Sequence, residues 1–217
     1  MTSNPDTEND NCLYPELTTT LNRLAGGFGQ ITSERKDVLK FLTTFIQSRI
    51  DSNQKVYLNF ICTHNSRRSH LAQLWAQAAA YFYDVPGVDC FSGGTEATAF
   101  NLRAVDAMKE AGFRITISKD GVNPVYEVGY APNAPFVIAF SKKYDDPFNH
   151  DQDFAAIMTC AHADENCPLV LGASARIALT YDDPKEFDGT ALESLKYKER
   201  VDEIGREILF AFSQVKK

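Results

Sequence analysis

The sequence contains no apolar run close to the roughly 20 residues that a helix needs to cross a bilayer. Its first residues are polar and lack the charged-then-apolar order of a secretory signal. Positive charge is also in deficit, since 22 Lys and Arg stand against 29 Asp and Glu, for a formal net charge of -7. Nucleic acid and anionic lipid surfaces would be repelled. These absences predict a cytoplasmic protein that binds neither membrane nor nucleic acid, with any positive charge confined to a pocket.

Cysteine is scarce and odd in number, with five residues in the chain. An odd count without a signal peptide disfavours a static disulfide framework and favours reduced thiols, some of them reactive. Cys90 lies in an apolar stretch and is predicted to be a small core residue. Cys12 lies in a polar tail and has no predicted role. The three that remain to be explained are Cys62, Cys160 and Cys167.

The chain changes character at about residue 55, where strand-like and helix-like segments begin to alternate. Such alternation predicts a three-layer α/β/α domain over residues 55–217, with a central, mainly parallel four-stranded sheet. Before it, residues 13–54 are predicted to be a helical extension broken near Gly26 and Gly27, and residues 1–12 a flexible tail. Residues 119–150 are expected to be a surface insertion or a lid. The expected strands are 56–61, 88–92, 113–117, 136–140, 154–159 and 176–179, and the expected helices are 69–83, 102–111 and 190–212.

One loop of this domain combines residues suited to anion binding and to nucleophilic attack. Amides of a tight loop at a helix N-terminus bind a tetrahedral oxyanion, and Arg68 adds a planar fork for two of its oxygens. The same positive surroundings favour the thiolate form of Cys62, which is the attacking form. We therefore predict a thiolate nucleophile acting on a phosphate-like substrate. Between the strand 56–61 and the helix 69–83, the loop reads Cys62-Thr63-His64-Asn65-Ser66-Arg67-Arg68-Ser69.

The same loop has a simpler interpretation, in which Cys62 is a buried residue that ends a strand and Arg68 is a surface charge. A cysteine and an arginine at this spacing occur often by chance, but their position between strand and helix favours the functional interpretation. Asn65 is expected to hold the loop by hydrogen bonds, and Ser66 or Ser69 to donate to the Cys62 sulfur. His64 could be a base or simply exposed.

The loop, the helix after it and the segment Ser92-Gly93-Gly94-Thr95 resemble the low-molecular-weight protein tyrosine phosphatase superfamily. That superfamily includes the thioredoxin-coupled arsenate reductases. In it a Cys-x5-Arg-Ser loop binds the oxyanion and a later Asp-Pro pair supplies a general acid, which Asp183 before Pro184 matches between the last strand and the C-terminal helix. Asp145-Asp146-Pro147 competes on composition, and either pair could instead form a turn or a helix cap. The resemblance covers about residues 55–215.

Two further cysteines rank the reductase above the phosphatase. Cys160 and Cys167, with six residues between them after a strand, are similar to the redox pair of the thioredoxin-coupled arsenate reductases. The resemblance implies that Cys62 attacks arsenate, that Cys160 attacks Cys62 and releases arsenite, and that Cys167 attacks Cys160. Thioredoxin would then reduce the last disulfide. Neither a metal nor an organic cofactor is implied.

Four alternatives stay open on the sequence alone. The two cysteines could be inert, could be relics in a phosphatase that hydrolyses phosphate monoesters through a phosphocysteine, or could ligate zinc with His162, for which an obvious fourth ligand is lacking. The loop could also be a non-catalytic oxyanion-binding module. His64 motivates this last alternative, because the family usually has glycine there and a bulky residue is expected to strain the loop. Arg67, where the family commonly has cysteine, would strengthen anion binding if it points inward.

Overall fold

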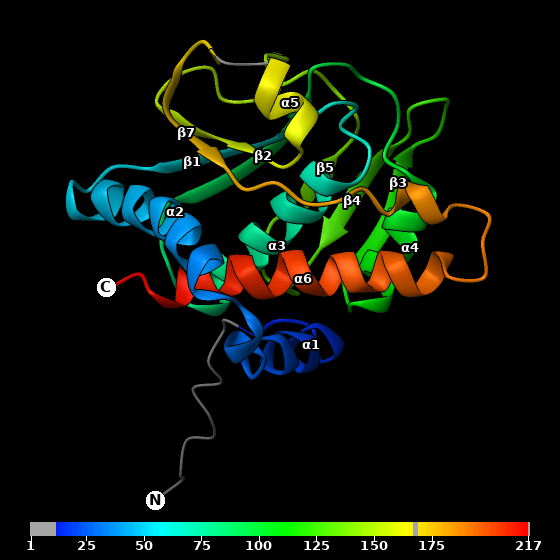
Figure 1. Cartoon of the computed structure of the whole chain (residues 1–217), viewed down its shortest axis with the longest axis horizontal. Helices are drawn as coiled ribbons and strands as arrows, with labels where there is room; N and C mark the ends of the chain where they lie inside the picture. The colour runs from blue at the N-terminus through cyan, green and yellow to red at the C-terminus, as the bar shows by residue number, and fades with distance from the viewer. Residues whose placement is uncertain (1–11, 167–168, 217) are drawn as a thin grey trace, which may run out of the picture.

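The computed structural model describes residues 12–166 and 169–216, and its centre is a parallel sheet in the order β2-β1-β6-β7 (Figure 1). The strand β1 pairs in parallel with both β2 and β6, and β6 pairs in parallel with β7. The predicted four-stranded parallel sheet is therefore confirmed, with Cys62 at the carboxyl end of a central strand. Its strands are β1 (Val56–Cys62), β2 (Val88–Gly94), β6 (Phe154–Met158) and β7 (Ala173–Ala178).

Helices lie on both faces of this sheet, because β1 is buried on both sides. Leu58 and Phe60 belong to the main core, which is shared with α2 (Ser33–Asp51), α3 (Arg68–Phe82) and α6 (Glu193–Ser213). Ile61 belongs to a smaller buried cluster that includes Ala163 of the short helix α5 (Ala161–Asn166). A strand that is buried on both faces reads as a continuous apolar run, as this one does. The predicted three-layer architecture is confirmed.

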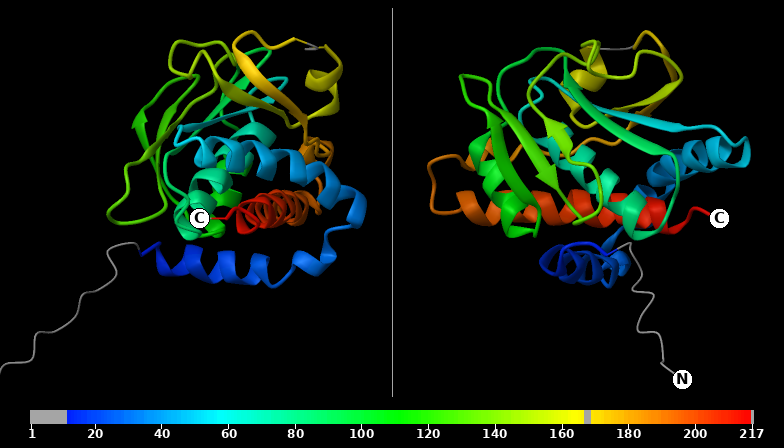
Figure 2. Two further views of the ribbon diagram at one scale, coloured as in Figure 1. Left: turned by 90° about the vertical axis from the view of Figure 1, so that its left-hand side faces the viewer. Right: turned by 180° about the vertical axis from the view of Figure 1, so that it is seen from behind.

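The N-terminal helices pack against the C-terminal helix and belong to the main core. Pro15 starts α1 (Pro15–Ala25), and Thr32 caps α2 by accepting a hydrogen bond from the Arg35 amide. Figures 1 and 2 show α1 on the side of α6 that faces away from the sheet. The close contact depends on Gly205, where a Cβ would lie 2.8 Å from Leu24 and 2.7 Å from Trp75 of α3. The helical extension is therefore built into the fold, while a domain boundary at residue 55 stays a prediction, and residues 1–11 of the predicted tail lie outside the described residues.

A second, antiparallel sheet of order β3-β4-β5 lies beside α4 (Leu102–Glu110). The expected strands 113–117 and 136–140 both exist, and they belong to this second sheet rather than to the central one. Only five residues, 120–124, connect β3 to β4, whereas a parallel crossover needs a dozen or more. The expected surface insertion 119–150 thus contains a strand that the sequence analysis missed. The bounds are β3 (Arg114–Lys119), β4 (Val125–Gly129) and β5 (Val137–Ala139).

The three helices expected at 69–83, 102–111 and 190–212 exist as α3, α4 and α6, and each begins and ends within a few residues of its predicted bounds. A 3-10 helix (Phe28–Gln30) joins α1 to α2, and another (Pro184–Phe187) follows Asp183. Within the described part of the chain, every helix is too short or too polar to cross a bilayer.

Candidate active site

Cys62 is the last residue of β1 and the first residue of the predicted loop, and its sulfur contacts a serine hydroxyl. The thiol is 3% exposed, and its Sγ lies 3.1 Å from Ser69 Oγ. Ser69 Oγ accepts a hydrogen bond of 2.9 Å from Asn65 Nδ2, so the Ser69 hydroxyl proton is free to point at the sulfur. A hydroxyl that donates to sulfur stabilises the thiolate. Of the two serines expected to take this role, Ser69 is the one in place.

Asn65 shapes the loop, as expected from the sequence. It is fully buried, and its Oδ1 accepts a hydrogen bond of 2.9 Å from the Lys142 amide. Its φ of 43° lies in the left-handed region, which asparagine tolerates better than most residues. The expected strain at His64 is wrong, because the left-handed turn falls on Asn65 and the φ of His64 is not positive.

The carbonyl groups of the loop are tied to neighbouring segments. His64 O accepts hydrogen bonds from the hydroxyls of Thr98 (3.1 Å) and Ser141 (2.9 Å). These contacts fix the loop, and the amides at the N-terminus of α3, which have no carbonyl partner within the helix, can bind an oxyanion. Three more carbonyls of the loop, those of Cys62, Thr63 and Ser66, accept from the amides of Thr95, Glu96 and Asn101.

Gly94, in the segment that carried part of the family resemblance, lies directly against this loop. A Cβ at this position would lie 2.2 Å from Glu96 O and 2.7 Å from Asn65 N. Contacts this short with backbone atoms cannot be relieved by a side-chain movement. The glycine is therefore required for the end of β2 to brace the loop.

The two arginines of the loop point to different partners. Arg68 donates to Asp183 Oδ2 at 2.8 Å and to the Tyr181 carbonyl at 2.9 Å. Arg67 donates through Nε to Tyr197 Oη at 2.7 Å and lies 3.4 Å from Asp188 Oδ2. The side chain of Arg67 thus anchors the loop to α6, so the condition for it to strengthen anion binding, an inward orientation, is not met. Both arginines lie near Asp183, at 2.8 Å for Arg68 and 3.9 Å for Arg67 Nε, so the short contact with this carboxylate is that of Arg68.

Asp183 is the only one of the competing acids that meets the loop among the described residues. Its Oδ1 accepts from the Lys185 amide at 3.1 Å and caps the 3-10 helix, while Oδ2 accepts from Arg68. Asp146 Oδ1 accepts from the Phe148 amide at 2.9 Å, which is the turn alternative. Both Asp145 and Asp146 line a separate cleft near residues 149–154.

Cys160 is buried in the same cluster as Cys62, at the start of α5. Its Sγ lies 3.4 Å from Thr63 Oγ1. Cys62 and Cys160 are both free thiols, and Cys167 lies outside the described residues. Among residues 12–166 and 169–216, no three metal-ligating side chains gather in one place.

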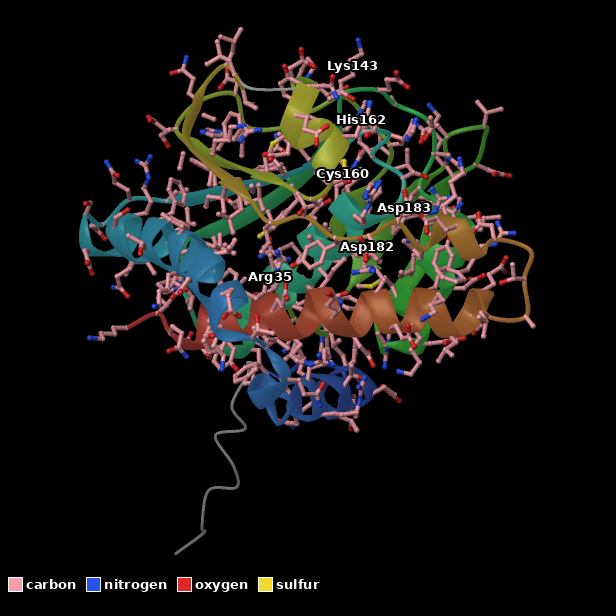
Figure 3. All side chains as sticks on the ribbon, viewed as in Figure 1. Arg35, Lys143, Cys160, His162, Asp182 and Asp183 are labelled. Carbon is pink, nitrogen blue, oxygen red and sulfur yellow. The ribbon has the colours of Figure 1, made fainter. Side chains whose placement is uncertain are left out.

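A cleft of about 610 Å³ opens beside these residues. Arg68, Cys160, His162 and Asp183 line one part of it, and Arg35 of α2 lines another. Figure 3 shows Cys160 and His162 at the start of α5, with Asp182 and Asp183 below them. The cleft therefore gives a ligand access to Arg68, Asp183 and Cys160 together.

Burial shifts the pKa values of several groups in this domain. Burial raises the pKa of Cys90 well above its usual range, so that this thiol stays protonated and acts as a core residue, as predicted. Burial also lowers the pKa of Lys142 to about 8 and raises the pKa of Tyr197 to about 12. The protonated Tyr197 hydroxyl can therefore donate to Asp188 Oδ1, at 2.8 Å, while it accepts from Arg67.

No protein-family model matches the sequence. A curated arsenate reductase of Halalkalibacterium halodurans is 32% identical over 157 residues, which cover 72% of this chain and 94% of that protein. This chain belongs to the arsenate reductase family. The arsenate reductase of Bacillus licheniformis is 31% identical over 158 residues, with the same coverage of both chains. The resemblance predicted from the sequence is thereby confirmed.

Solved structures also align with this member of the arsenate reductase family, at low sequence identity. A low-molecular-weight phosphotyrosine phosphatase of Vibrio cholerae aligns with a TM-score of 0.47 at 14% identity, over 73% of this chain and 94% of its own.

Several residues of the site were not found from the sequence. Thr98 and Ser141 hold the His64 carbonyl, and Tyr197 holds Arg67 from a helix more than a hundred residues later. His162 was considered only as a zinc ligand. A hydroxyl or imidazole in a segment without a motif gives no signal of its own, so these residues require the structure.

Proposed function

We propose that this chain reduces arsenate to arsenite by a thiol relay through Cys62, Cys160 and Cys167. The observation that carries the proposal is the pair of free, buried thiols at the oxyanion loop, with Cys160 in contact with Thr63 of that loop. The membership in the arsenate reductase family supports arsenate as the substrate.

In the first step, the loop amides and Arg68 bind arsenate and Cys62 attacks arsenic. Asp183 protonates the departing oxygen, for which its position beside Arg68 and its partial exposure of 26% are suited. A carboxyl group that is to act as an acid must bind a proton before the reaction, and displacement of Arg68 by the bound anion would allow this. The product is arsenic(V) bound to Cys62.

In the second step, the Cys160 thiolate attacks the Cys62 sulfur. The Cys62–arsenic bond breaks and its electron pair stays on arsenic, which leaves as arsenite, while a Cys62–Cys160 disulfide forms. Cys167 then attacks Cys160 and releases Cys62. Cys167 directly follows Asn166, the last residue of α5, in the sequence, so a movement of α5 would bring the thiols together.

The proposed reductant of the final Cys160–Cys167 disulfide is thioredoxin. The support for it is the spacing of the two cysteines and the exposed surface of α5 beside them. The relay uses only cysteine side chains, and the proposal includes no metal and no organic cofactor.

A second function is favoured by the Arg68–Asp183 pair alone. A phosphate monoester could be hydrolysed through a phosphocysteine on Cys62, with Asp183 as the acid. Such a phosphatase has no use for Cys160 or Cys167, which distinguishes the two functions.

The test follows arsenate-dependent NADPH oxidation with thioredoxin and thioredoxin reductase, alongside hydrolysis of para-nitrophenyl phosphate. Cys62→Ser, Cys160→Ser and Cys167→Ser are compared, with Cys90→Ser as a control cysteine outside the relay. We expect arsenate turnover to need all three relay cysteines and ester hydrolysis to need only Cys62. Brisk hydrolysis without arsenate turnover would replace the reductase by the phosphatase, and tight anion binding without either activity would support the binding module.

A further inference from the structure

His162 contacts the same threonine hydroxyl as the Cys160 thiol. Thr63 Oγ1 lies 3.4 Å from Cys160 Sγ and 3.2 Å from His162 Nδ1. The cysteine ends the strand region before α5, the histidine lies in its first turn, and the threonine belongs to the oxyanion loop. A thiol, a hydroxyl and an imidazole thus form a continuous chain from a buried sulfur to an exposed ring.

The protonation states of these groups fix the direction of the chain. A thiol and a hydroxyl can each donate one proton, and a neutral imidazole with its proton on Nε2 accepts at Nδ1. Cys160 can therefore donate to Thr63, and Thr63 to His162. The Ala163 amide also points at Cys160 Sγ, at 3.4 Å, and would stabilise a negative sulfur.

We propose that His162 is a positioning residue that draws the proton from Cys160 through Thr63, so that Cys160 attacks as a thiolate. The inference rests on the proposed arsenate reduction and adds to it the source of the second nucleophile. His162 acts through Thr63, the residue whose hydroxyl its ring contacts.

Atoms and electrons balance in this step. The Cys160 proton moves to Thr63 Oγ1, and the Thr63 proton moves to His162 Nδ1, which leaves an imidazolium ion and a thiolate. The thiolate pair forms the bond to Cys62 sulfur, and the bond between Cys62 and arsenic breaks with both electrons on arsenic. Arsenic falls from the +5 to the +3 state as two thiols become one disulfide. The exposed imidazolium then loses its proton to water.

Other charged groups near this wall of the cleft are already paired. Arg68 pairs with Asp183, and Asp164 of α5 pairs with Arg176 at 2.6 Å. Both carboxylates are held by arginines, whereas the His162 ring is exposed beside its threonine partner. Among the described groups that line the cleft near Cys160, His162 is the one with a hydrogen-bonded path to the thiol.

The size of the effect follows from ordinary thiol ionisation. A cysteine with a pKa near 8.5 is only about 3% ionised at pH 7, so assistance can raise the reactive fraction by at most about 30-fold. At pH 9 most of such a thiol is already ionised, and the gain falls below about twofold. Loss of His162 is therefore expected to matter at neutral pH and to matter little at high pH.

The experiment measures kcat and KM for arsenate in the coupled thioredoxin assay from pH 6.5 to 9 for His162→Ala and His162→Asn. Asparagine can accept the hydrogen bond from Thr63 but cannot take the proton. Glu110→Ala, an exposed change on α4 and outside the α5 surface proposed for thioredoxin, is the control. We expect both histidine variants to lose kcat up to about 30-fold at pH 7, with little change in KM, and to recover at pH 9. Added imidazole should restore the His162→Ala variant.

A second experiment measures the reactivity of the Cys160 thiol in the absence of arsenate. The rate of its alkylation by iodoacetamide, quantified by peptide mass spectrometry, should fall in both variants at pH 7 and converge with the wild-type rate at pH 9. Equal alkylation rates for wild type and His162→Ala at pH 7 would overturn the inference, as would full recovery of kcat in His162→Asn, which would indicate an orienting contact only. If the wild-type protein shows no arsenate turnover, the proposed function is wrong. The alkylation rates would still decide the role of His162 in that case.

Discussion

Lys142 holds its ammonium group in the protein interior, so replacement by methionine should change how stability depends on pH. The residue is 2% exposed, and its Nζ lies over the rings of Phe140 (4.5 Å) and Phe148 (5.2 Å). Burial lowers the pKa of Lys142 from 10.5 to about 8, against a smaller opposing effect of Asp146. Its own backbone amide holds Asn65 of the oxyanion loop, so the lysine lies beside the site.

The direction in which stability changes with pH follows from the lowered pKa of Lys142. The folded state binds this proton less tightly than the unfolded state, so the charged lysine costs stability below pH 8. The shift from 10.5 to about 8 corresponds to a cost on the order of 3 kcal/mol, fully present at pH 7. As the pH rises from 8 towards 10.5 the cost is relieved, and about 2 kcal/mol of it should be gone by pH 9.5.

The assay is urea unfolding from pH 6 to 9.5 with a reductant present, followed by fluorescence of Trp75, the single and fully buried tryptophan. The free energy of unfolding of wild type, minus that of Lys142→Met, should rise by about 2 kcal/mol between pH 7 and 9.5. It should be flat from pH 6 to 7. Lys143→Met, at the exposed neighbouring position, should run parallel to wild type. Parallel curves for wild type and Lys142→Met would refute the reasoning.

Two further predictions concern the acid and the extension. Asp183→Asn should lower kcat for arsenate by about 100-fold or more with a smaller change in KM, because the amide cannot protonate the departing oxygen. Steady-state kinetics measures this, and an unchanged kcat would show that Asp183 is not the acid. Arg35→Met should lower the free energy of unfolding by roughly 3 kcal/mol, because it leaves the buried Glu207 carboxylate without the arginine that lies 2.9 Å away. Urea unfolding checks this, and Glu207→Gln in the same chain should recover much of the loss; no recovery would show that the ion pair is not the cause.

The central sheet and the oxyanion loop could be predicted because their signals are local. A buried parallel strand is a continuous apolar run, and the loop from Cys62 to Ser69 has a fixed spacing at a strand-to-helix junction. Asp183 was favoured over Asp146 because its place, before a proline and between the last strand and the C-terminal helix, matches the resembled family. Each of these features is written in a few consecutive residues.

The remaining features depend on contacts between distant segments. The short β4 strand lies in a stretch with several prolines, and only its pairing with β3 and β5 identifies it. The orientation of Arg67 is set by Tyr197 and Asp188, which lie far away in the sequence. The expected strain at His64 was wrong for a related reason, since which loop residue takes the left-handed turn depends on how Asn65 is bonded to Lys142 and Ser69. Sequence spacing alone does not contain this information.

The most direct test of the thiol relay is a single turnover without external reductant. Fully reduced protein is mixed with arsenate, arsenite is quantified, and the disulfides are mapped by mass spectrometry for wild type and for Cys167→Ser. We expect one arsenite per protein in both cases, with a Cys160–Cys167 disulfide in wild type and a Cys62–Cys160 disulfide in the variant. Absence of arsenite, or arsenite formed while Cys160 stays a free thiol, would contradict the account.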